Sequence, residues 1–269
     1  MSQETCLLIA MPTQGDIATP TAKFLIGLTQ ALQKRRIPFA FHTYEFSDIV
    51  FSRNQLMSCF HTWTQFTHML LLDSDMVTEP SAIWRLLDFN EDFTATAYPQ
   101  KHPRWARLRE LIEAEAGLPD DQKSSMPDLL ARTWIYNHQL ADFGGTKWTA
   151  KRRGGFITVP ATGTGMMLMS RAVPETMVAK GIVERKPRLE KLPLHKGLIY
   201  HDYFSHRTSK DGGLMYGEDQ SFCMRWTHDC GGEIWLDTES PVIHYGNKPH
   251  RGDYRLKLEE DFPGAVDQE

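Results

Sequence analysis

Short apolar stretches alternate with amphipathic helical patterns through the first 99 residues, and this alternation limits the chain to one class of fold. Four stretches have strand character: Cys6–Met11, Pro38–Tyr44, Phe66–Leu72 and Phe93–Tyr98. Helices are expected between them, beginning at Thr19-Pro20, at Ser52-Arg53-Asn54 and at Pro80. This order predicts an α/β fold, a mainly parallel sheet flanked by helices in the Rossmann-like manner.

The pattern changes after residue 99. Residues 101–155 are polar and predict a helical insertion without a convincing strand, with helices over Trp105–Ala116 and Asp128–Leu140. Residues 184–210 are basic, rich in proline and histidine and without period, which indicates a mobile loop. Further short elements are expected at Ile157–Val159, Gly165–Met169, Arg171–Lys180, Glu233–Leu236 and Val242–Tyr245.

Composition excludes several classes of protein. The 269 residues carry a net charge of −4, and no apolar run is long enough to cross a bilayer, so we expect no membrane span. The first residues lack the basic segment and cleavage site of a secretion signal, which predicts a cytoplasmic protein. The four cysteines form no CxxC pair, and we expect them to be reduced thiols.

Two carboxylates follow the most apolar strand, in Met69-Leu70-Leu71-Leu72-Asp73-Ser74-Asp75. Residues at i and i+2 of an extended chain point to the same side, so Asp73 and Asp75 would lie together and need a cation. A divalent ion at the carboxyl end of a strand can also hold a phosphate. The competing interpretation is a solvated Asp-Ser-Asp turn before the next helix.

Three further motifs follow in order: Gly163-Thr164-Gly165 before a strand, Gly217-Glu218-Asp219 at a helix start, and Val242-Ile243-His244-Tyr245-Gly246. With Asp73-Ser74-Asp75 as a DxD motif, the set resembles the GT-A fold glycosyltransferases, family 2-like, which use nucleotide sugars and a divalent metal. The resemblance implies one GT-A domain over residues 1–269. Residues 1–99 would bind the nucleotide sugar, and residues from about 100 to 269, with the insertion at 101–155, would bind the acceptor.

The resemblance also implies roles for individual residues. Asp73, Asp75 and His244 would hold Mn²⁺ or Mg²⁺, and the metal would stabilise the departing diphosphate. Glu218 and Asp219 would be catalytic, with Asp219 the general base if the reaction inverts the anomeric centre; in retaining members it need not be. Binding of the donor, a UDP-sugar in the commonest case, would involve Pro12, Thr13, Gln14, Arg53, Asp73, Ser74, Asp75, Gly163, Thr164, Gly165 and Lys248.

Each of these residues also has a purely structural interpretation. His244 could be a core histidine, and the two glycines could form a simple turn. Acids such as Glu218 and Asp219 are favoured at any helix start by the dipole. Arg53 could pair only with a carboxylate such as Asp48, and Lys248 could be a surface lysine.

Two acid-free basic segments, Lys101–Arg109 and Lys147–Arg153, each contain a tryptophan. Cations beside indoles can bind phosphates, sugars or bases, which makes Lys101, Arg104, Trp105 and Trp148 candidates for acceptor binding. The alternative is a solvated face with two half-buried tryptophans. We therefore expect the acceptor to be a carbohydrate or another hydroxyl compound. A hydroxylated base in DNA is a further candidate, so nucleic acid is among the candidate partners.

The sequence therefore predicts a metal-dependent glycosyltransferase. A sugar-phosphate nucleotidyltransferase is disfavoured because Pro12-Thr13-Gln14-Gly15-Asp16, after the first strand, contains no cation. A noncatalytic nucleotide- or sugar-binding protein of the same fold is the other alternative. This alternative is disfavoured, because a noncatalytic protein has no need of the Asp73-Ser74-Asp75, Gly217-Glu218-Asp219 and His244 motifs together.

Overall fold

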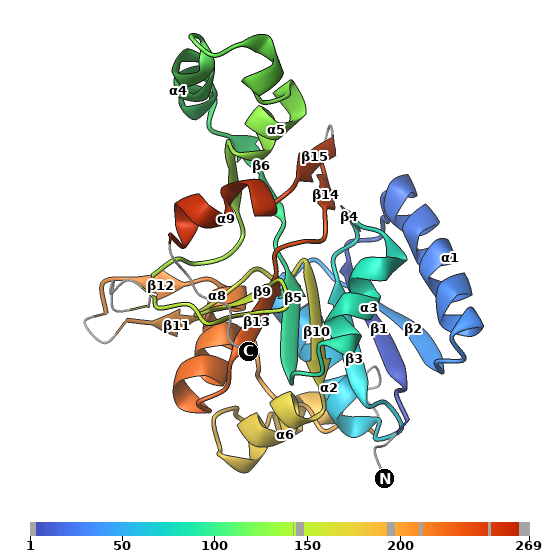
Figure 1. Ribbon diagram of the computed structural model, residues 1–269. Coiled ribbons are helices and arrows are strands. Elements are labelled where there is room, and N and C mark those ends of the chain that lie inside the picture. Colours follow the sequence, from blue (N-terminus) through green and yellow to red (C-terminus); the bar gives the residue numbers. More distant parts are fainter. Residues whose placement is uncertain are drawn as a thin grey trace.

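A mixed sheet runs through the middle of the molecule, in the order β2-β1-β3-β10-β5-β13-β9-β8 (Figure 1). The computed structural model describes residues 4–141, 143, 148–192, 197–209, 212–246 and 249–263. The strands of this sheet are β1 (Leu7–Thr13), β2 (Phe39–Glu45), β3 (His68–Leu72), β5 (Phe93–Thr96), β8 (Arg152–Arg153), β9 (Phe156–Val159), β10 (Met166–Ser170) and β13 (Ile234–Asp237).

Most strands of this sheet point the same way. β1, β2 and β3 are parallel, as are β5 and β13. β10 lies antiparallel between β3 and β5, and β9 lies antiparallel to β13. The predicted α/β class, with a mostly parallel sheet flanked by helices, is confirmed.

The central strands are apolar on both sides because helices cover both faces of the sheet. In β1, Leu7 and Ile9 face one apolar cluster while Leu8 and Ala10 face the other, as the period of two requires. The first cluster is completed by α1 (Thr19–Lys34) and α3 (Pro80–Asp88). The second is completed by α2 (Ile49–Thr62), α6 (Ala172–Ala179), α8 (Glu218–Met224), the π-helical turn η3 (Arg225–Asp229) and α9 (Arg255–Asp261).

A smaller sheet folds the end of the chain back onto the segment that follows β3. It has the order β15-β14-β4, with β4 at Met76–Val77, β14 at Val242–Tyr245 and β15 at Pro249–Gly252. The register pairs His244 with Met76, and Tyr245 N donates to the Asp75 carbonyl at 2.8 Å. Because of this pairing, His244 lies next to Asp75 of the DxD motif.

The helical insertion contains strands that the sequence does not predict. The helix expected over Asp128–Leu140 ends early, because α5 spans only Met126–Ala131, and β7 (Trp134–Tyr136) then pairs with β6 (Pro99–Pro103). Trp134 and Tyr136 are buried while Ile135 is exposed, the alternation of a strand, and aromatic and β-branched residues favour it. The helix expected over Trp105–Ala116 is confirmed as α4 (Trp105–Glu115), beside the turn η1 (Asp120–Gln122).

The expected mobile loop over 184–210 is wrong for its described residues. Tyr203 and Phe204 are fully buried, and Phe204 N donates to the Asn54 side chain at 2.7 Å. The apolar residues hidden among basic ones pack the segment onto α2. It also contains α7 (Pro187–Glu190) and β11 (Arg207–Thr208), which pairs with β12 (Met215–Tyr216).

Two expectations from composition are also tested. All four cysteines are free thiols. Among the described residues, none of the helices combines the length and apolar character that crossing a bilayer requires.

Arg171 closes the end of α2, and we predict that it is a main stabilising residue of this layer. Its guanidinium donates to the carbonyls of Phe60 at 2.8 Å and His61 at 2.9 Å. Arg171→Met keeps the apolar stem but removes these donors, so the free energy of unfolding in urea should fall by about 2 kcal/mol. Arg188→Met, at an exposed position of α7, should change it by less than about 0.5 kcal/mol. Equal losses would contradict this assignment.

Candidate functional site

The segments that follow β1 and β3 line one cleft of about 340 Å³. Both strands end at the same edge of the sheet because they are parallel, and ligands of α/β sheets bind beyond such ends. The cleft is lined by Pro12, Thr13, Gln14, Asp16, Phe46, Ile49, Asp73, Ser74 and Asp75. Its volume lies in the range of small-molecule sites, about 300–1,000 Å³. We call it the donor cleft, after the donor-binding role that the sequence resemblance implies for its lining residues.

Arg53 connects the DxD motif to the acidic pair at the start of α8. Its Nη2 lies 3.2 Å from Asp73 Oδ1, and its Nη1 lies 2.7 Å from Glu218 Oε1. The side chain of Arg53 is only 6% exposed. Asp48, the other partner considered for Arg53, instead caps α2 by accepting from Phe51 N at 3.0 Å.

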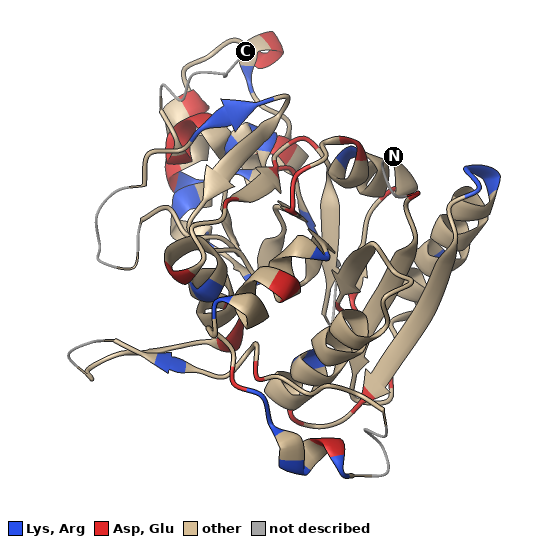
Figure 2. Cartoon of the chain, turned by 90° about the horizontal axis from the view of Figure 1, so that it is seen from below, with Lys and Arg blue, Asp and Glu red and all other residues tan. Residues whose placement is uncertain are grey.

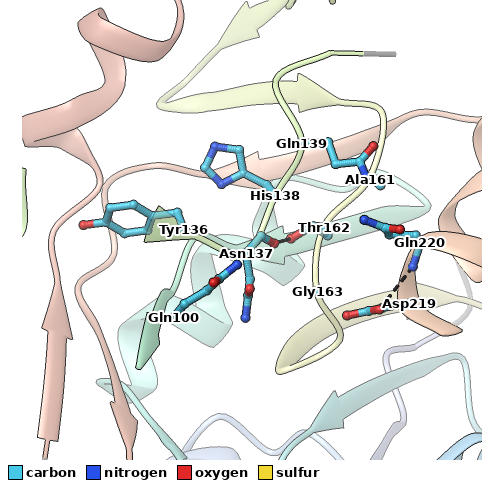
Figure 3. A pocket seen from close by; sticks show the side chains of 10 residues that line it. All are labelled: Gln100, Tyr136, Asn137, His138, Gln139, Ala161, Thr162, Gly163, Asp219 and Gln220. Atoms are coloured by element: carbon cyan, nitrogen blue, oxygen red, sulfur yellow. Dashed lines mark hydrogen bonds between the residues drawn. The ribbon is translucent and has the colours of Figure 1, made fainter. Parts of the chain in front are cut away.

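Asp219 lines a second hollow, which Figure 3 shows from close by. Burial raises the pKa of Asp219, and the neighbouring Glu218 charge raises it further against the opposing effect of Arg53. Its carboxylate accepts a bond from Gln220 N at 3.2 Å. Glu218 and Asp219 therefore have different surroundings: Glu218 binds a guanidinium, and Asp219 faces a hollow.

Asp75 lies between two groups that come from distant parts of the chain. Its Oδ2 is 3.4 Å from His244 Nε2 and 2.6 Å from Lys101 Nζ. Burial alone would raise the pKa of Asp75, but the hydrogen bonds and charges of His244 and Lys101 lower it below its ordinary value. Lys101 thus contacts the DxD motif itself.

Asp73, Asp75 and His244 are of residue types that can bind a divalent metal. His244 Nδ1 lies 2.9 Å from the Pro99 carbonyl, which fixes the orientation of the ring, and Nε2 lies 3.4 Å from Asp75 Oδ2. This is the carbonyl-oriented arrangement of metal-binding histidines. In the described parts of the chain, no three His, Cys, Asp or Glu side chains already form a metal-holding cluster. Asp73 is turned to Arg53, and Asp75 to Lys101.

The glycine loop packs against a buried tyrosine. Gly165 N donates to Tyr98 Oη at 3.0 Å, and Asp73 N donates to the Gly165 carbonyl at 3.0 Å. A Cβ on Gly165 would lie 2.7 Å from Tyr98 Cζ, and one on Gly163 would collide with the tyrosine hydroxyl. Thr164 between them is fully buried. In this structure the glycines therefore make room for Tyr98.

The basic segments are largely neutralised by acids from elsewhere in the chain. Arg107 pairs with Glu110 and Glu260, and the cations of 151–153 pair with Glu233, Glu259 and Glu91. Figure 2 shows acidic segments interspersed with the basic ones rather than one wholly basic face. The sequence could not reveal this, because the partners lie far along the chain.

The four candidate acceptor residues are not gathered in one place. Lys101 contacts Asp75, whereas Arg104 and Trp105 are exposed where β6 leads into α4. Trp148 packs against the core and its Nε1 donates to the Thr158 carbonyl at 2.9 Å, so its indole is structural. Lys248 lies outside the described residues.

Sequence reasoning missed several residues of the site. Tyr98 was expected only as the end of a strand. The contact of Lys101 with Asp75 depends on β6 lying beside β14, where His244 Nδ1 is 2.9 Å from the Pro99 carbonyl. The side chains of Gln100, Asn137, Gln139 and Gln220 also line the second hollow. No motif marks isolated carboxamides, so no sequence signal pointed to them.

No protein-family model matches this chain, and no curated protein matches it. Among solved structures, A197 from STIV is similar over 90% of this chain and 86% of its own, at 14% identity and a TM-score of 0.45. A glycosyltransferase involved in glycosylation of the major capsid of PBCV-1 is similar over 34% and 51%, at 15% identity and a TM-score of 0.23. A Drosophila beta,14galactosyltransferase 7 mutant, complexed with manganese, UDP-Gal and xylobiose, is similar over 91% and 70%, at 13% identity and a TM-score of 0.37.

We predict that Gly163→Ala destabilises the protein in the absence of any ligand. The added methyl group meets Tyr98, and overpacking of this kind costs about 1–3 kcal/mol. Gly27→Ala is the matched control, because Gly27 lies within α1 with open space around it and should gain up to about 1 kcal/mol. Thermal unfolding measures both. Unchanged stability of the Gly163 variant would contradict this packing role.

We predict a larger loss for Arg53→Met. Removing the guanidinium leaves the Asp73 and Glu218 carboxylates close together without their cation, which should lower the free energy of unfolding by about 3 kcal/mol. Lys123→Met removes the partner of Asp120 in an ion pair whose carboxylate side chain is 97% exposed, and should cost less than about 0.5 kcal/mol. Urea denaturation distinguishes them; similar losses would refute a bridging role for Arg53.

Proposed function

We propose that this protein is a metal-dependent glycosyltransferase that moves a sugar from a nucleotide sugar, a UDP-sugar, to an acceptor hydroxyl. The observation that carries the proposal is the joint position of the DxD motif and His244 at the donor cleft. Asp73 and Asp75 line that cleft with Pro12–Gln14, and His244 presents Nε2 toward Asp75. Two of the similar structures are glycosyltransferases, but their TM-scores of 0.23 and 0.37 are too low to support the proposal.

In this proposal Asp75 and His244 hold Mn²⁺ or Mg²⁺, with Asp73 as the third candidate ligand. The bound ion would act as a Lewis acid for the diphosphate leaving group. Lys101 must then leave Asp75, and its ammonium would be available to the diphosphate as a second positive charge. Pro12, Thr13 and Gln14, which line the same cleft, are the residues proposed to bind the nucleotide.

Asp219 is the proposed general base. Its raised pKa makes it a better proton acceptor than an ordinary carboxylate, and it faces a hollow rather than a cation. Asp219 takes the proton of the acceptor hydroxyl as that oxygen bonds to the anomeric carbon. The bond from the anomeric carbon to the diphosphate oxygen breaks, and the diphosphate leaves with the electron pair, so the anomeric centre is inverted.

Glu218 has a positioning role in this scheme. It holds Arg53, which also holds Asp73, so donor and acceptor sides keep a fixed separation.

We also propose that the protein is cytoplasmic. The four free cysteines are consistent with this location.

The test is release of nucleotide from a panel of UDP-, GDP-, TDP- and CMP-sugars in the presence of Mn²⁺. We expect one donor to respond, and Asp75→Asn to lower the rate by about 100-fold. Asp219→Asn should lower transfer by about 10²–10⁴-fold while the protein still shows a thermal shift with UDP and Mn²⁺.

The matched control is Asp120→Asn, an exposed acid outside the site, which should behave like the unaltered protein. As the pH is lowered, the transfer rate should fall with a midpoint above the pKa of an ordinary aspartate. The reason is that Asp219 must be ionised to act and its pKa is raised. If no donor responds with Mn²⁺ or, in a repeat of the assay, with Mg²⁺, or if Asp75→Asn retains full activity, the proposal fails.

A further inference from the structure

Four carboxamide side chains converge on the hollow beside Asp219. Gln100 comes from β6, Asn137 and Gln139 follow β7, and Gln220 belongs to α8. In Figure 3 Gln100 and Asn137 lie on one side of the hollow, and Gln139 and Gln220 on the other, with Asp219 below Gln220. We call these four residues and Asp219 the amide pocket.

The carboxamides are half-buried, yet none of the four makes a hydrogen bond through its side chain to any part of the chain that the structure describes. None of their nitrogen or oxygen atoms is among the fully buried polar atoms without a partner in the described residues, so these groups are open to a ligand that enters the hollow. Each carboxamide can donate and accept, and a sugar hydroxyl does the same.

The backbone beneath these side chains is already fixed. Asn137 N donates to the Tyr98 carbonyl at 3.0 Å, Gln139 N donates to the Ala161 carbonyl at 2.9 Å, and Gly163 N donates to the Asn137 carbonyl at 2.6 Å. The side chains, rather than the main chain, are therefore left for recognition. A fixed backbone lowers the entropy lost on binding.

The charge of the pocket wall excludes one class of ligand. Neither lysine nor arginine is among the described residues that line the hollow, and Asp219 is its acidic member. Burial lowers the pKa of His138 to about 3, so this lining residue is neutral. A phosphate placed here would meet a carboxylate and no cation. An uncharged polyhydroxyl group meets only donors and acceptors.

The pocket is small and adjoins the donor cleft. It measures about 110 Å³, against about 30 Å³ per water molecule in the liquid, enough for part of one sugar unit. Gln100 lines it, and the next residue, Lys101, contacts Asp75. Arg53 also links the two places, because it contacts both Glu218, the neighbour of Asp219, and Asp73 of the donor cleft.

We infer that the amide pocket binds the acceptor and that the acceptor is an uncharged sugar unit, held through its hydroxyls by Gln100, Asn137, Gln139 and Gln220. The inference rests on the proposed glycosyltransferase function. It separates two acceptor classes that the sequence leaves open, because a phosphorylated acceptor or the backbone of DNA requires cations that this pocket does not contain.

The test compares lactose, maltose and cellobiose with glucose 6-phosphate and a DNA duplex as acceptors for the responding donor. Gln139→Leu/Gln220→Leu keeps side-chain volume and removes two carboxamides. We expect transfer to an uncharged sugar, and an acceptor KM raised about tenfold in the double variant with the thermal response to UDP and Mn²⁺ retained. Gln122→Leu, at an exposed position of η1, is the control and should leave the KM unchanged.

Saturation-transfer NMR with the same sugars separates this inference from the proposed function. Sugar signals that the double variant loses support the pocket even if no donor responds. Preferred use of glucose 6-phosphate, salt-sensitive use of the DNA duplex, or an unchanged KM and unchanged NMR signals in the double variant would each overturn the inference while donor turnover still supports the glycosyltransferase proposal.

Discussion

The buried guanidinium of Arg53 holds together two acidic motifs from opposite parts of the chain, and the geometry of the site depends on it. Arg53 lies 20 residues from Asp73 and 165 residues from Glu218 in the sequence, yet it bonds to both. Without a cation at this place, carboxylates from β3 and α8 would repel each other in a poorly solvated environment. Arg53 therefore fixes the spacing between the donor cleft and Asp219.

Asp75 also has a cationic partner, Lys101, but this lysine is more exposed than Arg53. Arg53 is buried and has two carboxylates as partners, so its position is fixed. The Lys101 side chain is 35% exposed and holds one oxygen of Asp75. A lysine on a flexible stem can leave that oxygen when another cation or a diphosphate arrives. The site therefore contains buried ion pairs at Arg53 and a half-exposed ion pair between Lys101 and Asp75 that can exchange. An exchangeable pair at Asp75 suits the proposed binding of a metal together with a nucleotide.

Much of the fold could be predicted from the sequence because its signals are local. The apolar run of β3 and the helix start at Pro80 each determine their own element, and parallel strands bring Pro12–Gln14 and Asp73–Asp75 to one edge. Non-local relations could not be read in this way. The strand β7 depends on pairing with β6, and the basic residues near Trp148 are neutralised by glutamates from other segments. Tyr98 lies against Gly163 and Gly165 only because of the order of β3, β10 and β5.

The proposed glycosyltransferase activity depends on a divalent cation that Asp75 and His244 hold and that binds the diphosphate of a nucleotide sugar. The most direct measurement is anomalous diffraction from crystals grown with MnCl₂ and UDP. We expect a manganese peak bonded to Asp75 and His244, with UDP in the cleft beside Pro12–Gln14 and Lys101 displaced from Asp75. A structure with UDP bound in which Lys101 still pairs with Asp75 and no manganese lies between Asp75 and His244 would contradict it.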